Sequence, residues 1–104
     1  MMLILRDDAV IEIFDSPTNP PNWIEGTDIE NEEYRFCDDS GQQFIGVITK
    51  PSSLIHQAKF ALQRSGPPNP ANAIALVDQA KALEANDRFQ SLVELRQHLA
   101  TKSE

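Results

Sequence analysis

The sequence predicts an α+β fold, in which a small, mostly antiparallel sheet of three or four strands packs against C-terminal α-helices. Up to Pro51, hydrophobic residues gather in short runs rich in β-branched and aromatic side chains, as they do in strands. Beyond Pro51 they recur at the helical spacing of three or four residues. The chain of 104 residues has the usual length of one domain. We therefore expect a single domain over 1–104, with a β-rich acidic half at 1–51 and a helical half at 52–104.

Two aliphatic runs near the N-terminus predict the first pair of strands. They span residues 3–5 and 10–14. Asp7 and Asp8 lie between them, and aspartate side chains favour turns. The two runs are thus expected to form a tight hairpin.

A short helix is predicted after this hairpin. Asn19 stands before two prolines, which is a capping residue followed by a favoured first helical position. One or two helical turns would carry Trp23 and Ile24 and end at Gly26.

A second hairpin follows. Tyr34 and Phe36 alternate with polar neighbours as in a strand, and residues 38–41 supply turn-forming side chains and a glycine. The return strand, 43–49, is apolar on both faces. It is therefore expected to be central in the sheet or covered by a helix.

The first helix of the second half is predicted over 52–66. Ser52 or Ser53 can cap it, and Gly66 with two prolines ends it. Its apolar side chains share one helical face: Leu54, Ile55, Ala58, Ala61 and Leu62.

Two more helices are predicted, and they should form an antiparallel hairpin. Asn69 caps the first, Pro70 opens it, and it runs to about Ala85. The second extends from Phe89 to Leu99 at helical spacing. A single continuous helix over 71–100 is the alternative, because the Asn and Asp between the two helices do not forbid helix as proline does.

The predicted core combines apolar side chains from both halves. Its members are Ile11, Ile13, Phe14, Trp23, Tyr34, Phe36, Phe44, Ile45, Val47, Leu54, Ala58, Leu62, Leu76, Ala80, Leu83, Phe89, Leu92 and Leu99.

Charge is distributed unevenly along the chain. The net charge of −7 arises in residues 1–51, where eleven acidic and three basic residues give −8, whereas 52–104 carries five acidic and six basic residues. Six acidic residues fall within twelve positions: Asp28, Glu30, Glu32, Glu33, Asp38 and Asp39. Such a cluster would repel a phosphate backbone, which disfavours nucleic-acid binding. It is either a docking face for a basic protein or a solvated edge that keeps the chain soluble.

The sequence offers no catalytic residues, cofactor site or metal site. His56 and His98 lie in different predicted helices, and neither stands in an H-E-x-x-H or other metal-ligand pattern. Asp38 and Asp39 should raise the pKa of the neighbouring Cys37 thiol, contrary to what a nucleophile needs. Cys37 is expected to be a packed strand residue, and residues 38–41 a turn.

The sequence also bears on location. It has no apolar run of the roughly 20 residues that a membrane span requires, and its N-terminus does not resemble a signal peptide. A lone cysteine suits a reducing compartment. We expect a cytoplasmic protein.

Residues 10–48 resemble small acidic bacterial proteins of unassigned function. The resemblance is carried by Ile13 to Pro17, by Trp23 to Tyr34 with its Asp-Ile-Glu-Asn-x-Glu-Tyr pattern, and by Asp38 to Gly41. It implies a β-α-β-β start, although prolines here stand where the helix of such proteins usually carries Ala and Glu. Some proteins of this kind are similar to immunity partners of bacterial toxins.

A second resemblance lies in the helical half. The stretch 73–87 is similar to the second helix of a tetratricopeptide repeat, but no second copy is present, and an ordinary Ala-rich packing helix is the stronger interpretation.

Three functions follow as hypotheses. The first is a non-catalytic protein-binding module whose acidic segment meets a basic partner, with an immunity protein as a specific form. The second is an assembly protein that forms a homodimer through an exposed stripe of Val93, Leu95 and Leu99. An enzyme using the clustered carboxylates is the least favoured, because these carboxylates lie in a polar stretch.

Overall fold

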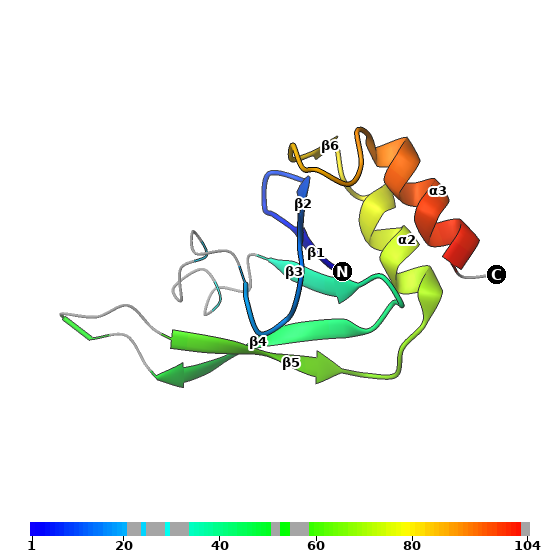
Figure 1. Cartoon of the computed structure of the whole chain (residues 1–104). Coiled ribbons are helices and arrows are strands. Elements are labelled where there is room, and N and C mark those ends of the chain that lie inside the picture. Colours follow the sequence, from blue (N-terminus) through cyan, green and yellow to red (C-terminus); the bar gives the residue numbers. More distant parts are fainter. Residues whose placement is uncertain (21–23, 25–28, 30–33, 51–52, 55–58, 103–104) are drawn as a thin grey trace.

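The computed structural model describes residues 1–20, 24, 29, 34–50, 53–54 and 59–102, which form a six-stranded sheet and two helices (Figure 1). The strands are β1 (Met2–Leu5), β2 (Val10–Phe14), β3 (Arg35–Asp38), β4 (Gln43–Lys50), β5 (Lys59–Ser65) and β6 (Ala82–Leu83). Their order is β5-β4-β3-β1-β2-β6, and the helices are α2 (Pro70–Asp78) and α3 (Leu92–Lys102). The α+β class is confirmed. The predicted number of three or four strands is wrong, because the described chain has six. The sheet is mostly antiparallel, as predicted, and β6 pairs in parallel with β2.

The two predicted hairpins are confirmed. β1 pairs antiparallel with β2 across the turn that contains Asp7 and Asp8, and β3 pairs antiparallel with β4 across residues 39–42. In the first turn, Ala9 takes a positive φ of 62°, and the Arg6 guanidinium donates hydrogen bonds to both carboxylate oxygens of Asp8. β1 also pairs with β3, so it lies inside the sheet and all four of its side chains are buried.

Side chains alternate between the two faces of a strand, so the sheet contributes to two hydrophobic cores. On one face, residues of β1, β2 and β3 pack against both helices; we call this the helix side. Its buried members are Leu3, Leu5, Ile11, Cys37, Ala73, Leu76, Val77, Leu95 and Leu99. On the opposite face the buried members are Met2, Ile4, Ile24, Ile29, Phe36 and Phe44.

α2 begins where the sequence predicts. The Asn69 side chain accepts a hydrogen bond from the amide of Ala71, and Pro70 occupies the first turn. The helix ends at Asp78 rather than near Ala85. After it, the chain pairs with the free edge of β2, where the amides of Lys81 and Glu84 donate to the carbonyls of Ala9 and Ile11 at 2.7 and 2.8 Å.

This pairing competes successfully with continued helix, because it supplies the same backbone hydrogen bonds at a sheet edge. Ala80 and Leu83 are therefore not helical, and 73–87 is not one repeat-like helix.

α3 is a separate helix, so the alternative of one helix over 71–100 is wrong. Asn86 Oδ1 accepts hydrogen bonds from the amides of Arg88 and Phe89, and this turn redirects the chain before α3 begins. α2 and α3 lie side by side and run in opposite directions, as predicted (Figure 1). Neither of these two described helices has the length and apolar composition that a membrane-spanning helix requires.

The helix predicted over 52–66 is wrong, because residues 59–65 form strand β5. β5 pairs antiparallel with β4, with Gly46 opposite Leu62 and Val47 opposite Ala61. Phe60 and Leu62 are partly buried while their neighbours Lys59, Ala61 and Gln63 are exposed, which is the alternation of a strand. The weak helical preference of this segment yields to tertiary pairing with β4.

The predicted core is confirmed in part. Ile11, Phe36, Phe44, Leu76 and Leu99 are buried. Partly buried members are Ile13, Phe14, Tyr34, Leu62, Ala80, Leu83, Phe89 and Leu92. The prediction is wrong for Ile45, Val47 and Leu54, which are exposed. Trp23, Ala58 and the short helix predicted after Asn19 lie outside the described residues.

Candidate functional site

The helix side of the sheet carries exposed apolar side chains on β4. β4 lies between β3 and β5, so its predicted central position is confirmed. Nevertheless, Ile45 is 50% exposed and Val47 is 37% exposed. α2 contacts β1 and β3, whereas β4 and β5 extend away from the helices as a long hairpin (Figure 1). A central strand with exposed apolar side chains marks a surface that a partner can cover.

We call this surface the open face and define it by the exposed helix-side residues of β4 and β5. The register fixes its members, because directly paired residues share a face: Gln43, Ile45, Val47, Ala61 and Gln63. Gln43 pairs with Cys37, which belongs to the helix-side core, so all five point to the side on which α2 and α3 lie.

A groove of about 540 Å³ lies between the open face and α2. Its walls include Ile29 and Tyr34, which adjoin the acidic segment in sequence, and also Arg35, Gln43, Ile45, Asn72, Ala75 and Gln79. Arg35 Nη1 donates a hydrogen bond of 2.7 Å to Gln79 Oε1, which ties β3 to the end of α2. Amide side chains thus flank an apolar floor, a combination suited to a peptide or protein segment.

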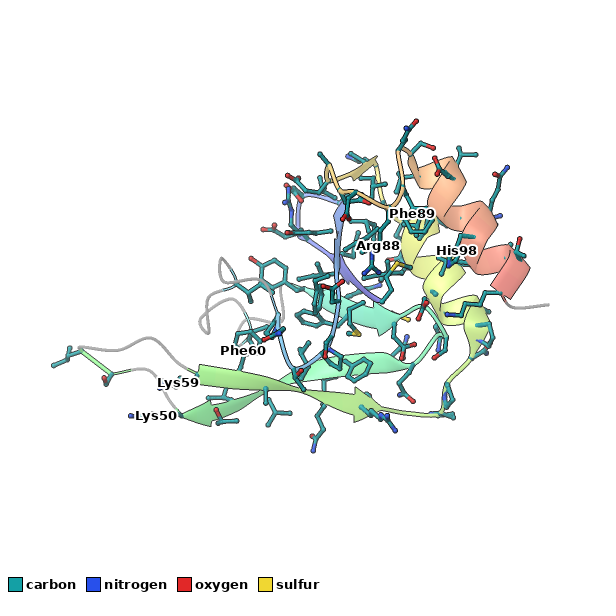
Figure 2. All side chains as sticks on the ribbon, viewed as in Figure 1. Lys50, Lys59, Phe60, Arg88, Phe89 and His98 are labelled. Carbon is teal, nitrogen blue, oxygen red and sulfur yellow. The ribbon has the colours of Figure 1, made fainter. Side chains whose placement is uncertain are left out.

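Three basic residues lie beside the open face: Arg35, Lys50 and Lys59. No acidic residue occurs from position 40 to 77, although the whole chain carries −7. Lys50 and Lys59 pair directly at the outer end of the hairpin, beyond a register shift, and Figure 2 shows both there. Among the described residues, neither these lysines nor Arg35 has a carboxylate within 4.0 Å, whereas Arg6, Arg88, Arg96 and Lys102 all do.

Opposed like charges destabilise a pair of strands slightly. An anionic partner would relieve this repulsion between Lys50 and Lys59.

Of the six acidic residues predicted to bind a partner, the structure describes only Asp38 and Asp39. Asp28, Glu30, Glu32 and Glu33 lie outside the described residues. Asp38 holds the β3–β4 turn, since its Oδ1 accepts hydrogen bonds from the amides of Ser40 and Gln42 at 2.9 Å and from Ser40 Oγ at 2.6 Å. The prediction of a turn at 38–41 is confirmed, and the Asp38 carboxylate is occupied by it.

Asp39 is also occupied within the chain. Lys102 Nζ donates a hydrogen bond to Asp39 Oδ2, and the α-amino group of Met1 lies 3.6 Å from Oδ1. Partial burial opposes ionisation of Asp39, but the bond from Lys102 and the charge of the α-amino group outweigh it and lower the Asp39 pKa. The carboxylate thus ties the end of α3 to the turn after β3.

This tie predicts a pH-dependent contribution to stability. Since folding lowers the pKa of Asp39, its ionised form stabilises the protein above the unfolded pKa of about 4, and that contribution is lost as the pH falls through the lower folded pKa. We expect Asp39→Asn to reduce the free energy of unfolding at neutral pH and to reduce it progressively less in acid.

Urea denaturation between about pH 7 and pH 3 checks this expectation. Asp7→Asn, at an exposed position of the first turn, is the control. A difference between wild type and Asp39→Asn that stays constant down to the lowest pH would show that the ion pair contributes nothing.

Cys37 is a packed residue, as predicted. It is buried in the helix-side core, and burial, aided by the charges of Asp38 and Asp39, raises the pKa of its thiol to about 12. The thiolate therefore does not form at neutral pH. His98 is exposed beside Phe89, with ring centroids 5.2 Å apart, and Figure 2 shows the pair at α3.

His56 lies outside the described residues, and within those that are described no three His, Cys, Asp or Glu side chains gather as a metal site would need.

The predicted dimer stripe on α3 does not exist as an exposed surface. Leu95 is 0% exposed and Leu99 is also buried, both in the helix-side core, whereas Val93 is 67% exposed. The helical period places Val93 on a different side of α3 from Leu95 and Leu99. The stripe prediction is therefore wrong for two of its three residues.

The sequence does not predict the open face, because its pattern places Ile45 and Val47 in the core. The one sequence signal that indicates a distinct surface on the β4–β5 hairpin is the absence of acidic residues from 40 to 77. Comparison with models of known protein families, with curated proteins and with solved structures finds no match for this chain, and the resemblance of residues 10–48 to small acidic bacterial proteins stays a prediction.

Proposed function

We propose that this chain is a non-catalytic protein-binding module and that the open face is its binding surface. The observation that carries the proposal is the exposure of Ile45 and Val47 on a strand inside the sheet, next to a groove lined by α2. The same side of β1 and β3 is covered by helices. Apolar side chains left uncovered beside a concave surface are typical of a protein-interaction site.

The long β4–β5 hairpin suits this role. It extends away from the helices, so a partner can approach the open face without displacing α2 or α3 (Figure 1). Its seven-residue strand β5 is stabilised by continuous pairing with β4, which gives the surface a fixed shape before binding. We place the module in the cytoplasm, where the buried Cys37 thiol would stay reduced.

The acidic segment remains a candidate second surface, proposed from charge alone. Its residues Asp28, Glu30, Glu32 and Glu33 would face a basic protein, as in an immunity protein. Asp38 and Asp39 are left out of this surface because hydrogen bonds within the chain use their carboxylates.

Affinity capture from native lysate tests the proposal. We expect the double variant Ile45→Ser, Val47→Ser to retain its partner at least about tenfold less than wild type, because it removes the apolar contact at the centre of the surface. The matched control is Val93→Ser, which removes an exposed apolar side chain from α3 and should retain the partner fully.

Circular dichroism confirms that both variants are folded. The proposal is overturned where wild type retains no partner, or where the double variant retains the same partner as well as wild type does.

A further inference from the structure

We infer that the occupant of the open face is one acidic, amphipathic α-helix of a different protein, lying along β4 and β5. The inference rests on the proposed function and specifies its partner. The width of the open face, its apolar centre and the basic side chains beside it support this occupant.

The width of the open face fits one helix. Neighbouring strands lie about 4.8 Å apart, and helices packed side by side lie about 8–10 Å apart, so two strands are as wide as one helix. α2 and α3 already form a layer on this side of the sheet, and the layer stops short of β4 and β5 (Figure 1). One additional helix would complete it. A single partner strand would instead pair with the outer edge of β5 and leave the open face bare.

The surface suits the apolar stripe of an amphipathic helix. Ile45, Val47 and Ala61 form its apolar centre, and Ala75 of α2 lines the adjoining groove. Gln43, Gln63 and Gln79 border this centre with uncharged amides. A helix with apolar side chains every three or four residues would bury them here while its polar flanks meet the amides.

Basic side chains about three helical turns apart select an acidic helix. Arg35 lines the groove level with Ile45, and Lys50 and Lys59 stand at the outer end of the hairpin. From Ile45 to Lys50 the strand spans roughly 17 Å at about 3.3 Å per residue, which equals about three turns of helix. Carboxylates near the two ends of such a helix would meet these bases, which have no carboxylate partner among the described residues.

Neither described helix of a second copy offers the acidic amphipathic helix that the open face requires. α3 carries Glu94 against Arg96 and Lys102, so it is not acidic, and its apolar residues Leu95 and Leu99 are already buried. α2 likewise buries its apolar face through Ala73, Leu76 and Val77.

Edge-to-edge pairing of two β5 strands is also unfavourable. It would bring Lys59 and Arg64 of both copies together without acidic residues between them. Since a second copy offers neither a suitable helix nor a suitable edge among its described residues, we assign the helix to another protein.

A synthetic peptide is the probe. It has about 18 residues, with leucine every third or fourth position and glutamate on the remaining face. Two control peptides are used, one with the same composition in scrambled order and one with every glutamate replaced by lysine. Each is titrated into the isotopically labelled full chain, and chemical shifts are followed by NMR.

We expect the acidic amphipathic peptide alone to shift the resonances of Ile45, Val47, Ala61 and Gln79. Replacing both lysines, Lys50→Glu with Lys59→Glu, should weaken its binding about tenfold, because the end of the surface would then repel the peptide. Val93→Ser should leave the binding unchanged.

Three results would overturn the inference. The first is equal shifts with the scrambled or lysine peptide, and the second is the absence of shifts with the acidic peptide. The third is a shift of open-face resonances with protein concentration alone, which would make a second copy the occupant. If the Ile45→Ser, Val47→Ser double variant still loses its partner in affinity capture, the open face remains the binding surface and only the class of occupant is wrong.

Discussion

Gly41→Ala is expected to lower the free energy of unfolding by about 3 kcal/mol or more. Gly41 has a φ of +86°, and a Cβ placed there would lie 1.8 Å from the carbonyl oxygen of Asn69. The Gly41 carbonyl accepts hydrogen bonds from the Asn69 amide at 3.2 Å and from Asn72 Nδ2 at 3.1 Å. The β3–β4 turn thus lies in direct contact with the start of α2. The side chain of an alanine at position 41 would have to separate the turn from α2 or distort the backbone of both.

Gly66→Ala is the matched control. Gly66 also has a positive φ, +72°, but a Cβ there would meet no atom within 4 Å. Only the strain of a left-handed alanine remains, about 1 kcal/mol. Urea denaturation of both variants measures the difference. Equal losses would mean that the turn and α2 are not in contact, which would contradict the packing described above.

Leu95→Ala is expected to lower the free energy of unfolding by about 2–5 kcal/mol. Leu95 is 0% exposed and packs in the helix-side core, so its truncation leaves a cavity between α3 and its neighbours. For a domain with a total stability of roughly 5–15 kcal/mol, the variant would approach unfolding at moderate temperature. Its thermal midpoint should fall correspondingly.

Val93→Ala should change the free energy of unfolding by less than about 0.5 kcal/mol, because Val93 is 67% exposed and alanine favours helix. Thermal and urea denaturation of the two variants compare them directly. A loss for Val93→Ala as large as that for Leu95→Ala would mean that α3 presents a different face to the sheet. In that case Leu95 and Leu99 could again be part of an exposed dimer stripe.

The features that the sequence predicts well are those with local causes. The turn at 38–41 forms because Asp38 and Gly41 lie within four residues of each other. α2 begins at Pro70 because the preceding Asn69 side chain accepts a hydrogen bond from the amide of Ala71. Both interactions join residues that are close in sequence, so the sequence pattern is enough to predict them.

The features that the sequence predicts poorly depend on residues far apart in the chain. The sequence predicts a helix where β5 forms, because Ala61 and Leu62 fit a helical face. The pairing of β5 with β4 is evident only in the structure. β6 has two residues and pairs with β2 some seventy positions earlier, too short and too remote for any pattern. Tertiary pairing overrides local preference in both.

Long-range contacts also determine the candidate site. The hydrogen bond between Lys102 and Asp39 joins residues 63 positions apart, so the sequence alone predicts Asp39 as part of the acidic docking face. A strand that is apolar on both faces indicates that the faces favour burial but not whether the chain itself supplies the cover. The sequence therefore predicts Ile45 and Val47 in the core, whereas both are exposed in the structure.

Site-specific photocrosslinking tests the central claim most directly. A photoreactive benzoylphenylalanine replaces Ile45 in one sample of the full chain and Val93 in another, and both are irradiated in native lysate. The open-face account predicts that position 45 crosslinks to one other protein, at a segment that mass spectrometry can locate, and that position 93 does not. Absence of a crosslink at position 45, or equal crosslinking at both positions, would contradict it.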